Sequence, residues 1–296
     1  MAVVTPLNGD GSVDAARLLA HCQGLLVAGC DGIALFGTSG EGPSFSVAER
    51  MAVLEALLAG GLPPDRIIVG AACAALPDVA ALSHHAAAAG CAAVLMMPPF
   101  FFDGVDDEGV FRAYATAIET TGTPAPKVLL YHIPKVSRVP LGLGLIERLA
   151  AAFPDIVVGV KDSSGDWPST ERLLERRGDL RIFVGHEPHV GRAIANGGAG
   201  TICGIANAAP TLLRRLCDAP AGPAGSAARL AVDQVAAAFD GRPVIPTLKA
   251  LTAAASGFPG WNRLRPPLTP LADDDQEAVA RLLRSAQRAA TVGAPG

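Results

Sequence analysis

The stretch IVVGVKDSSG at residues 156–165 is the part of the sequence that decides the fold. Its first five residues are apolar and mostly β-branched, which is typical of a strand buried on both faces in a parallel sheet. The polar turn that follows closes the strand, and Lys161 stands at the strand's C-terminal end. The chain has only four lysines, at 127, 135, 161 and 249, so a lysine at this place is unusual.

The same strand signal recurs along the chain, each time followed by a helical pattern. Strands are predicted at 2–5, 33–36, 67–71, 92–96, 127–131, 156–160, 181–184 and 200–203. Helices are predicted at about 14–28, 47–59, 77–88, 106–120, 142–152, 168–177 and 187–196. Eight such units predict an α/β protein with a closed parallel barrel, the TIM (β/α)8 fold. An open doubly wound sheet is the main alternative, but no G-x-G-x-x-G follows the first strand.

Strand signals stop at Pro210. Helical patterns at about 226–239, 246–256 and 273–290 predict a C-terminal helical extension. We therefore expect residues 1–209 to form the barrel and residues 210–296 to form helices that pack on it, the two parts making one structural unit.

The composition favours small-molecule chemistry. Half of the residues are hydrophobic, 18% are charged and the formal net charge is −4, so there is no basic field for nucleic acid or an anionic membrane surface. No apolar run reaches the ~20 residues that a membrane helix needs, and Met1 leads into a Thr-Pro turn. We expect a soluble, cytoplasmic protein. Six scattered cysteines without C-x-x-C spacing are expected to be free thiols, with no metal site.

In such a barrel, catalytic groups stand at the C-terminal ends of the strands. An amine at the end of a buried strand is costly as an ammonium, and the neutral amine attacks carbonyls; alternatively, Lys161 reaches solvent or pairs with Asp162. Thr38 and Ser39, between glycines after the second strand, suit a small carboxylate, although a plain glycine-rich turn would look the same. Tyr131 ends the fifth strand; its phenol can relay a proton, or simply reach water from the core.

Together these residues indicate Schiff-base chemistry on a 2-oxo acid. The lysine is the nucleophile, the phenol moves protons and the hydroxyl-lined loop anchors the carboxylate. The protonated imine is itself the electron sink, so we expect neither a metal nor another cofactor. Two further positions lie at strand ends: Gly185 after the seventh strand and Ile202 in the eighth.

Four ordered motifs carry a resemblance to a known family. They are GTSGE at 37–41, YHIP at 131–134, GVKDSSGD at 159–166 and GTICGIAN at 200–207. With these motifs the chain resembles the dihydrodipicolinate synthase and N-acetylneuraminate lyase family of class I aldolases over nearly its whole length. The resemblance implies that Lys161 forms an imine with pyruvate or a related 2-oxo acid and that Tyr131 shuttles protons. It also implies that Thr38 and Ser39 bind the carboxylate, that Ile202 lines the pocket, and that the protein is a homo-oligomer, a tetramer or a dimer.

The sequence departs from the synthase pattern at several positions. Val136 stands where the synthase has an arginine for the aldehyde's carboxylate, which leaves Arg138, two residues on, as a candidate. Phe101 stands where the synthase has a second relay tyrosine, and His132 replaces the usual asparagine. These departures favour the sugar-acid lyase branch of the family.

We therefore expect a Schiff-base aldolase or lyase that joins pyruvate to an aldehyde or cleaves the product, with a 2-keto-3-deoxy sugar acid as the type of substrate. Dihydrodipicolinate synthase itself is the alternative enzyme. A dehydratase or decarboxylase using the same imine, and a non-catalytic relative that binds 2-oxo acids, also stay open.

Overall fold

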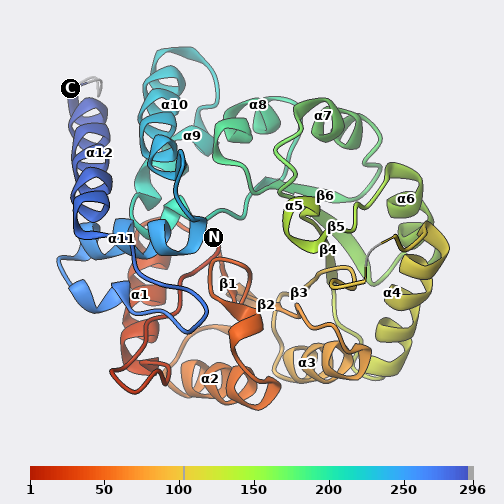
Figure 1. Ribbon diagram of the computed structural model, residues 1–296. Coiled ribbons are helices and arrows are strands. Elements are labelled where there is room, and N and C mark those ends of the chain that lie inside the picture. The colour runs from red at the N-terminus through yellow and green to blue at the C-terminus, as the bar shows by residue number, and fades with distance from the viewer. Residues whose placement is uncertain (103, 293–296) are drawn as a thin grey trace.

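The computed structural model describes residues 1–102 and 104–292. Seven parallel strands form one curled sheet whose order follows the chain (Figure 1). The strands are β1 (Ile33–Leu35), β2 (Ile67–Gly70), β3 (Ala93–Met96), β4 (Val128–His132), β5 (Val157–Asp162), β6 (Arg181–Val184) and β7 (Gly200–Thr201). The predicted α/β barrel is therefore confirmed, and the doubly wound alternative is wrong because neighbours in sequence are neighbours in the sheet.

The first predicted strand, at 2–5, forms only an isolated bridge, between Ala2 and Ala34. The Ala2 N–H donates to the carbonyl of Cys203 at 2.9 Å, and the Val3 N–H donates to the carbonyl of Ala34 at 3.1 Å. The N-terminal segment thus lies between β1 and the chain beyond β7, where an eighth strand would close the barrel. Asn207 reinforces this closure, because its side chain accepts from the Val4 N–H at 3.1 Å and donates to the Ala2 carbonyl at 2.8 Å.

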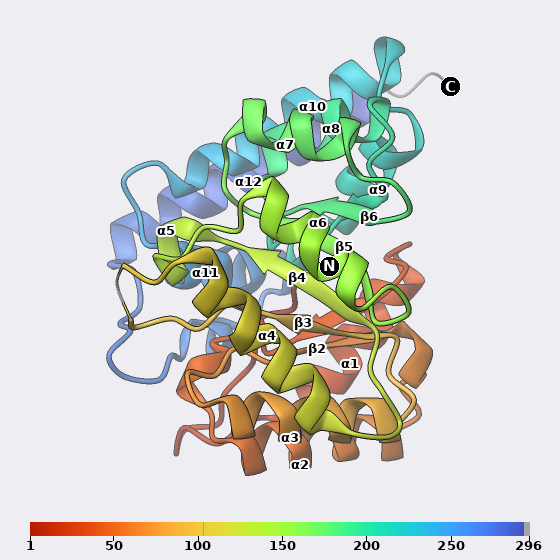
Figure 2. The same cartoon turned by 90° about the vertical axis from the view of Figure 1, so that its right-hand side faces the viewer.

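Helices surround the sheet. The outer ring contains α1 (Ala15–Val27), α2 (Val47–Ala59), α3 (Leu76–Ala88), α4 (Asp107–Thr121), α6 (Leu143–Ala152), α7 (Trp167–Glu175) and α8 (Val190–Ala195), whereas the short α5 (Pro134–Ser137) lies inside the ring at the end of β4 (Figures 1 and 2). The predicted capping box opens α2: Ser46 Oγ accepts from the Glu49 N–H, and the Glu49 carboxylate accepts from the Ser46 N–H. The short α5 escaped the prediction because it is a single turn.

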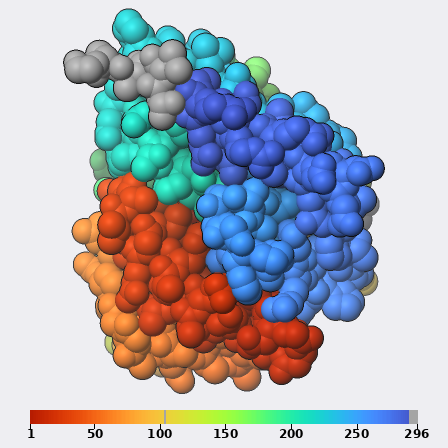
Figure 3. Space-filling view, turned by 90° about the vertical axis from the view of Figure 1, so that its left-hand side faces the viewer, coloured from red at the N-terminus to blue at the C-terminus, as the bar shows by residue number. Residues whose placement is uncertain are grey.

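The C-terminal part consists of helices α9 (Pro210–Asp218), α10 (Gly222–Ala236), α11 (Val244–Ser256) and α12 (Asp273–Val292). The sequence analysis missed α9 and placed the start of α10 four residues late. α10 packs against α9 and α12, while α11 packs against the 3-10 turn η4 (Ile205–Asn207) beyond β7. In Figure 3 the surface of these helices, in teal to blue, adjoins the red surface of the first part of the chain, which includes α1. The boundary between residues 209 and 210 stays a prediction.

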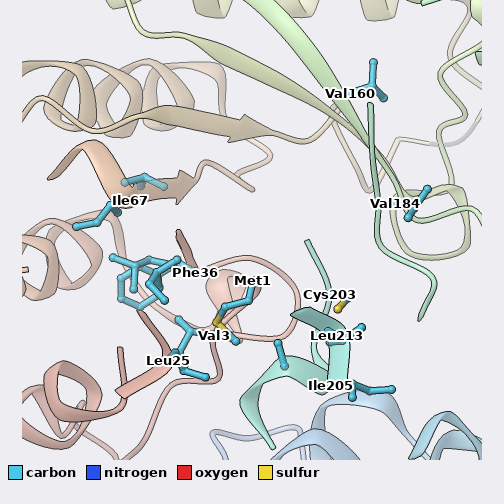
Figure 4. Packing of buried hydrophobic residues seen from close by; sticks show 14 of the residues in the cluster. Met1, Val3, Leu25, Phe36, Ile67, Val160, Val184, Cys203, Ile205 and Leu213 are labelled. Carbon is cyan, nitrogen blue, oxygen red and sulfur yellow. The ribbon is translucent and has the colours of Figure 1, made fainter. Parts of the chain in front are cut away.

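Buried side chains separate into two layers. One cluster fills the inside of the sheet and includes Ala34, Leu95, Leu129, Tyr131 and Ile202. A larger cluster lies between the strands and the surrounding helices, and Figure 4 shows how Met1 and Val3 join it between Phe36 on one side and Cys203 on the other. Alternate residues of a strand therefore serve different layers, which explains why the strands are apolar throughout.

Candidate active site

A cavity of about 580 Å³ opens at the C-terminal ends of the strands, and the C-terminal helices supply part of its wall. It brings together six of the seven predicted site residues: Thr38, Ser39, Tyr131, Lys161, Gly185 and Ile202. They come from positions far apart in the sequence. Parallel strands deliver them to one place because all their carboxyl ends meet at the same end of the barrel.

Lys161 is held inside the protein at the end of β5. It is only 3% exposed, and it is paired in register with Tyr131 of β4. Its Nζ lies 4.2 Å from the centroid of the Tyr131 ring. The two alternatives for Lys161, reaching solvent and pairing with Asp162, do not match this geometry. The amine does not extend to the outer surface, and the Asp162 carboxylate has other hydrogen-bond partners. The Asp162 carboxylate accepts from Thr170 Oγ1 at 2.5 Å and from the Ser164 N–H at 2.9 Å.

Tyr131 and the loop after β1 form a second contact in the cavity. The Tyr131 hydroxyl and Thr38 Oγ1 lie 3.2 Å apart, and either can be the donor. The loop is folded tightly, since the Glu41 N–H donates to the Thr38 carbonyl at 3.1 Å and Thr5 Oγ1 donates to the Gly40 carbonyl at 2.8 Å. The Thr38 hydroxyl therefore stands at a fixed position beside the phenol, and Ser39, the next residue of the loop, lines the same cavity.

A buried ion pair ties this loop to α11. Glu41 and Lys249 form a salt bridge in which both side chains are fully buried. Lys249 also donates to the Arg263 carbonyl at 2.5 Å, and the Glu41 carboxylate accepts from the Arg265 N–H at 3.1 Å. Burial lowers the pKa of the Lys249 amine, although Glu41 acts in the opposite direction. The sequence analysis assigned no role to this pair; its signal was that Lys249 is one of so few lysines.

Position 185 has no room for a side chain, because the side chains of Lys161 and Ser163 lie close to its backbone. A Cβ at this position would lie 2.0 Å from Ser163 Oγ and 3.2 Å from Lys161 Cε. The Gly185 N–H donates to the Asp162 carbonyl at 2.7 Å, which fixes the backbone there. The predicted Ile202 lies next to it across the sheet: its N–H donates to the Val184 carbonyl at 3.1 Å, and its buried side chain belongs to the inner cluster with Tyr131.

Four further polar residues line the cavity. His186 and Glu187 follow β6, while Asp233 and Asp240 come from α10 and the turn after it. Glu187 Oε1 accepts from the Gly204 N–H at 3.1 Å and from the Ile205 N–H at 3.2 Å. Burial raises the pKa of the Glu187 carboxyl and that of Asp233. Helix packing brings the two aspartates to the cavity, so no local sequence signal marked them.

Arg138 does not line this cavity. It is exposed at the end of α5 and borders a separate hollow of about 490 Å³ together with His132 and Lys135. Val136 is also exposed. His132 is buried; its Nδ1 accepts from the Leu141 N–H at 3.0 Å, and burial lowers its pKa. Phe101 is 87% exposed, in the loop after β3.

The cysteines and possible metal ligands do not form a second site. All six cysteines are free, and burial raises the pKa of the Cys22 and Cys203 thiols to about 12. Across residues 1–102 and 104–292, no three His, Cys, Asp or Glu side chains are grouped so that they could hold a metal ion. None of the helices in that part of the chain has the length and apolar character needed to cross a membrane.

This arrangement of lysine, tyrosine and hydroxyl loop can be compared with known proteins. A sequence model of the Dihydrodipicolinate synthetase family matches residues 1–286. The chain belongs to this family. It is 38% identical over 285 residues to an uncharacterized DapA-like lyase of Chloroflexus aurantiacus, covering 94% of this chain and 93% of the relative. It is 30% identical over 300 residues to the 4-hydroxy-tetrahydrodipicolinate synthase of Azoarcus sp., covering 97% of both.

Solved structures of the dihydrodipicolinate synthetase family share the fold. Dihydrodipicolinate synthase from Agrobacterium tumefaciens superposes with a TM-score of 0.91 at 36% identity, covering 96% of this chain and 97% of that one. A 2-keto-3-deoxygluconate aldolase variant from Sulfolobus solfataricus gives 0.86 at 19% identity, covering 97% and 94%, which shows likeness of fold alone. The predicted resemblance is confirmed. The relatives named above are a DapA-like lyase and a synthase.

Proposed function

We propose that the chain is a class I aldolase or lyase in which Lys161 forms a Schiff base with pyruvate or a related 2-oxo acid. The observation that carries the proposal is the buried Lys161 amine, 4.2 Å from the ring of Tyr131, whose hydroxyl in turn lies 3.2 Å from Thr38 Oγ1. Nucleophile, proton carrier and carboxylate anchor thus share one cavity.

The chemistry follows from these positions. The neutral amine of Lys161 attacks the 2-oxo carbon, and loss of water leaves an imine whose protonated form draws electrons from the neighbouring carbon. In the cleavage direction, Tyr131 takes the proton of the substrate's 4-hydroxyl as the C3–C4 bond breaks, and an aldehyde leaves. The remaining enamine of pyruvate is protonated at carbon and then hydrolysed, which returns the free lysine. Condensation runs through the same steps in reverse.

The anchor for the 2-oxo acid is the loop after β1. Thr38 and Ser39 offer hydroxyl groups beside the phenol, and charge-assisted hydrogen bonds to a carboxylate are about twice as strong as neutral ones. Thr38 therefore has two roles: it helps to bind the carboxylate, and it holds the Tyr131 hydroxyl in a defined position.

Trapping the imine tests the proposal directly. The protein is treated with borohydride in the presence of pyruvate, and its peptides are examined by mass spectrometry. A pyruvate-sized addition is expected on Lys161. Lys161→Ala should abolish the addition, while Lys135→Ala, which removes an exposed lysine outside the cavity, should retain it. No addition on the unmodified protein would contradict the mechanism.

Dihydrodipicolinate synthase activity is the second candidate, favoured by the 36% identity to the Agrobacterium structure of that name. The cavity wall argues against this activity, because it lacks the arginine that would hold the aldehyde's carboxylate. Val136, at that position, is exposed, and Arg138 borders a different hollow. Condensation of pyruvate with aspartate semialdehyde should be slow compared with condensation onto a sugar-derived aldehyde. A dehydratase or decarboxylase using the same imine, and a non-catalytic relative, would be recognised by imine trapping without aldol turnover. The homo-oligomeric state and the cytoplasmic location stay predictions.

A further inference from the structure

The charges around the Lys161 cavity are unevenly distributed. Lys161 and Tyr131 are buried at its inner end, whereas Asp233 and Asp240 are exposed and mark its outer end; the half-buried Glu187 also lines it. Among residues 1–102 and 104–292, no arginine lines this cavity, and Lys161 is its one lysine. Once Lys161 is committed to the imine, none of the described residues lining the cavity offers a lysine or arginine side chain for a second anionic group.

The carboxylates differ in how firmly they are held. Glu187 is partly buried, and two backbone N–H groups fix its Oε1, so its carboxyl group is a preorganised partner rather than a freely moving side chain. Asp233 and Asp240 are exposed at the mouth and come from α10 and the segment that follows it, where α10 packs against the turn containing Glu187. Arg229 is close enough to act on the pKa of Asp233, but it does not line the cavity.

The size of the cavity leaves room for a second reactant. A volume of about 580 Å³ is far more than a three-carbon 2-oxo acid fills, so the aldehyde portion of the substrate occupies the outer end. Carboxylates accept hydrogen bonds from hydroxyl groups, and a site built around such bonds discriminates against analogues that lack the hydroxyls. The same carboxylates repel a phosphate or a second carboxylate.

We infer that the outer end of the Lys161 cavity selects a hydroxylated aldehyde that carries no anionic group at its far end. Glu187, Asp233 and Asp240 are the specificity-determining residues. The inference rests on the proposed function, because it assigns the second substrate of the same imine reaction. It separates this chain from enzymes whose aldehyde substrate bears a carboxylate or a phosphate.

Three aldehydes of equal chain length test the inference, each condensed with pyruvate: glyceraldehyde, glyceraldehyde 3-phosphate and propanal. We expect kcat/KM for glyceraldehyde to exceed that for its phosphate at least about tenfold at low ionic strength. Propanal, which lacks the hydroxyls, should also be a poorer substrate. A phosphate ester that reacts as well as glyceraldehyde, or propanal that does so, would overturn the inference.

Two double variants that remove the same amount of charge test whether the discrimination against phosphate arises at the mouth of the cavity. Asp233→Asn with Asp240→Asn should raise the ratio of kcat/KM for the phosphate to that for glyceraldehyde by roughly two- to tenfold, and added salt should shrink the gain. Asp155→Asn with Asp179→Asn removes the same charge just before β5 and β6, at the opposite end of the barrel, and should leave the ratio unchanged. Equal ratios in both double variants would refute the assignment.

Imine trapping with pyruvate, done in parallel, separates two kinds of failure. Trapping on Lys161 together with a preference for the phosphate would contradict the inference but would still support the proposed function. No trapping on Lys161 would remove the proposed function and the inference together.

Discussion

Replacing Lys249 by methionine is the perturbation that tests most sharply how the candidate site is held. The Lys249 side chain is fully buried, forms a salt bridge with the fully buried Glu41 and donates to the Arg263 carbonyl. Methionine fills a similar volume without the charge. The variant therefore leaves the Glu41 carboxylate inside the protein with the Arg265 N–H as its remaining hydrogen-bond donor.

The expected loss follows from the burial of both partners. Removing one member of a buried ion pair destabilises a protein by roughly 3–5 kcal/mol, because the other charge stays behind without compensation. For long chains such as this one, about 1 kcal/mol corresponds to a shift of roughly 2 °C in Tm, so Lys249→Met should lower Tm by roughly 6–10 °C. Glu41→Gln combined with Lys249→Met removes both charges and should recover more than half of that loss.

Thermal unfolding followed by circular dichroism measures these shifts. Lys127→Met is the matched control, because that exposed lysine makes a single hydrogen bond, to the Asp155 carbonyl. Lys127→Met should lower the free energy of unfolding by less than about 1 kcal/mol. If Lys249→Met is as stable as the control, or the double variant is as unstable as the single one, then the Glu41–Lys249 ion pair does not hold the loop as described. Because Glu41 belongs to the loop that carries Thr38 and Ser39, the KM for pyruvate should also rise in Lys249→Met.

Three further predictions concern the site and its surroundings. Gly185→Ala should weaken imine trapping with pyruvate, since the added methyl group would collide with Ser163 Oγ at 2.0 Å and crowd Lys161 Cε at 3.2 Å; Gly24→Ala, which meets nothing within 4 Å, should not. Arg138→Ala should change kcat/KM less than about threefold in the aldol assay, because its side chain lies outside the cavity; a larger loss would place it in the site. Contact with Arg265 lowers the pKa of the Glu49 carboxyl from 4.5 to about 2, so its stabilising effect is present above pH 4.5 and is lost as pH falls toward 2. Glu49→Gln, which can keep the capping box, should reduce the loss of stability over that pH range in acid-unfolding curves.

Much of the fold could be predicted because its signals are local. Apolar stretches of strand length, capping residues such as Ser46 and the regular alternation with helices all lie within short windows of sequence. The places where prediction failed are equally instructive. The segment 2–5 pairs through only a few hydrogen bonds, and α9 was overlooked although its residues Leu212, Leu213 and Leu216 are buried at helical spacing.

Some residues of the candidate site could also be predicted from the sequence, and others could not. Lys161, Tyr131, Thr38 and Ser39 could be found from the sequence because a parallel barrel brings every strand's C-terminal end to one face, so position along a strand determines position in space. Arg138 could not be placed by that rule. It lies beyond the strand in a short helix, and the direction of that turn carries its side chain into another hollow.

The barrel and the inner half of the cavity, where we propose the imine chemistry, could therefore be predicted from the sequence. The outer half depends on contacts between distant parts of the chain. Asp233 and Asp240 reach the cavity because α10 packs against the turn after β6, and Glu41 meets Lys249 because α11 lies over the barrel mouth. Such contacts join residues that no period or local motif relates, and they depend on how whole helices pack.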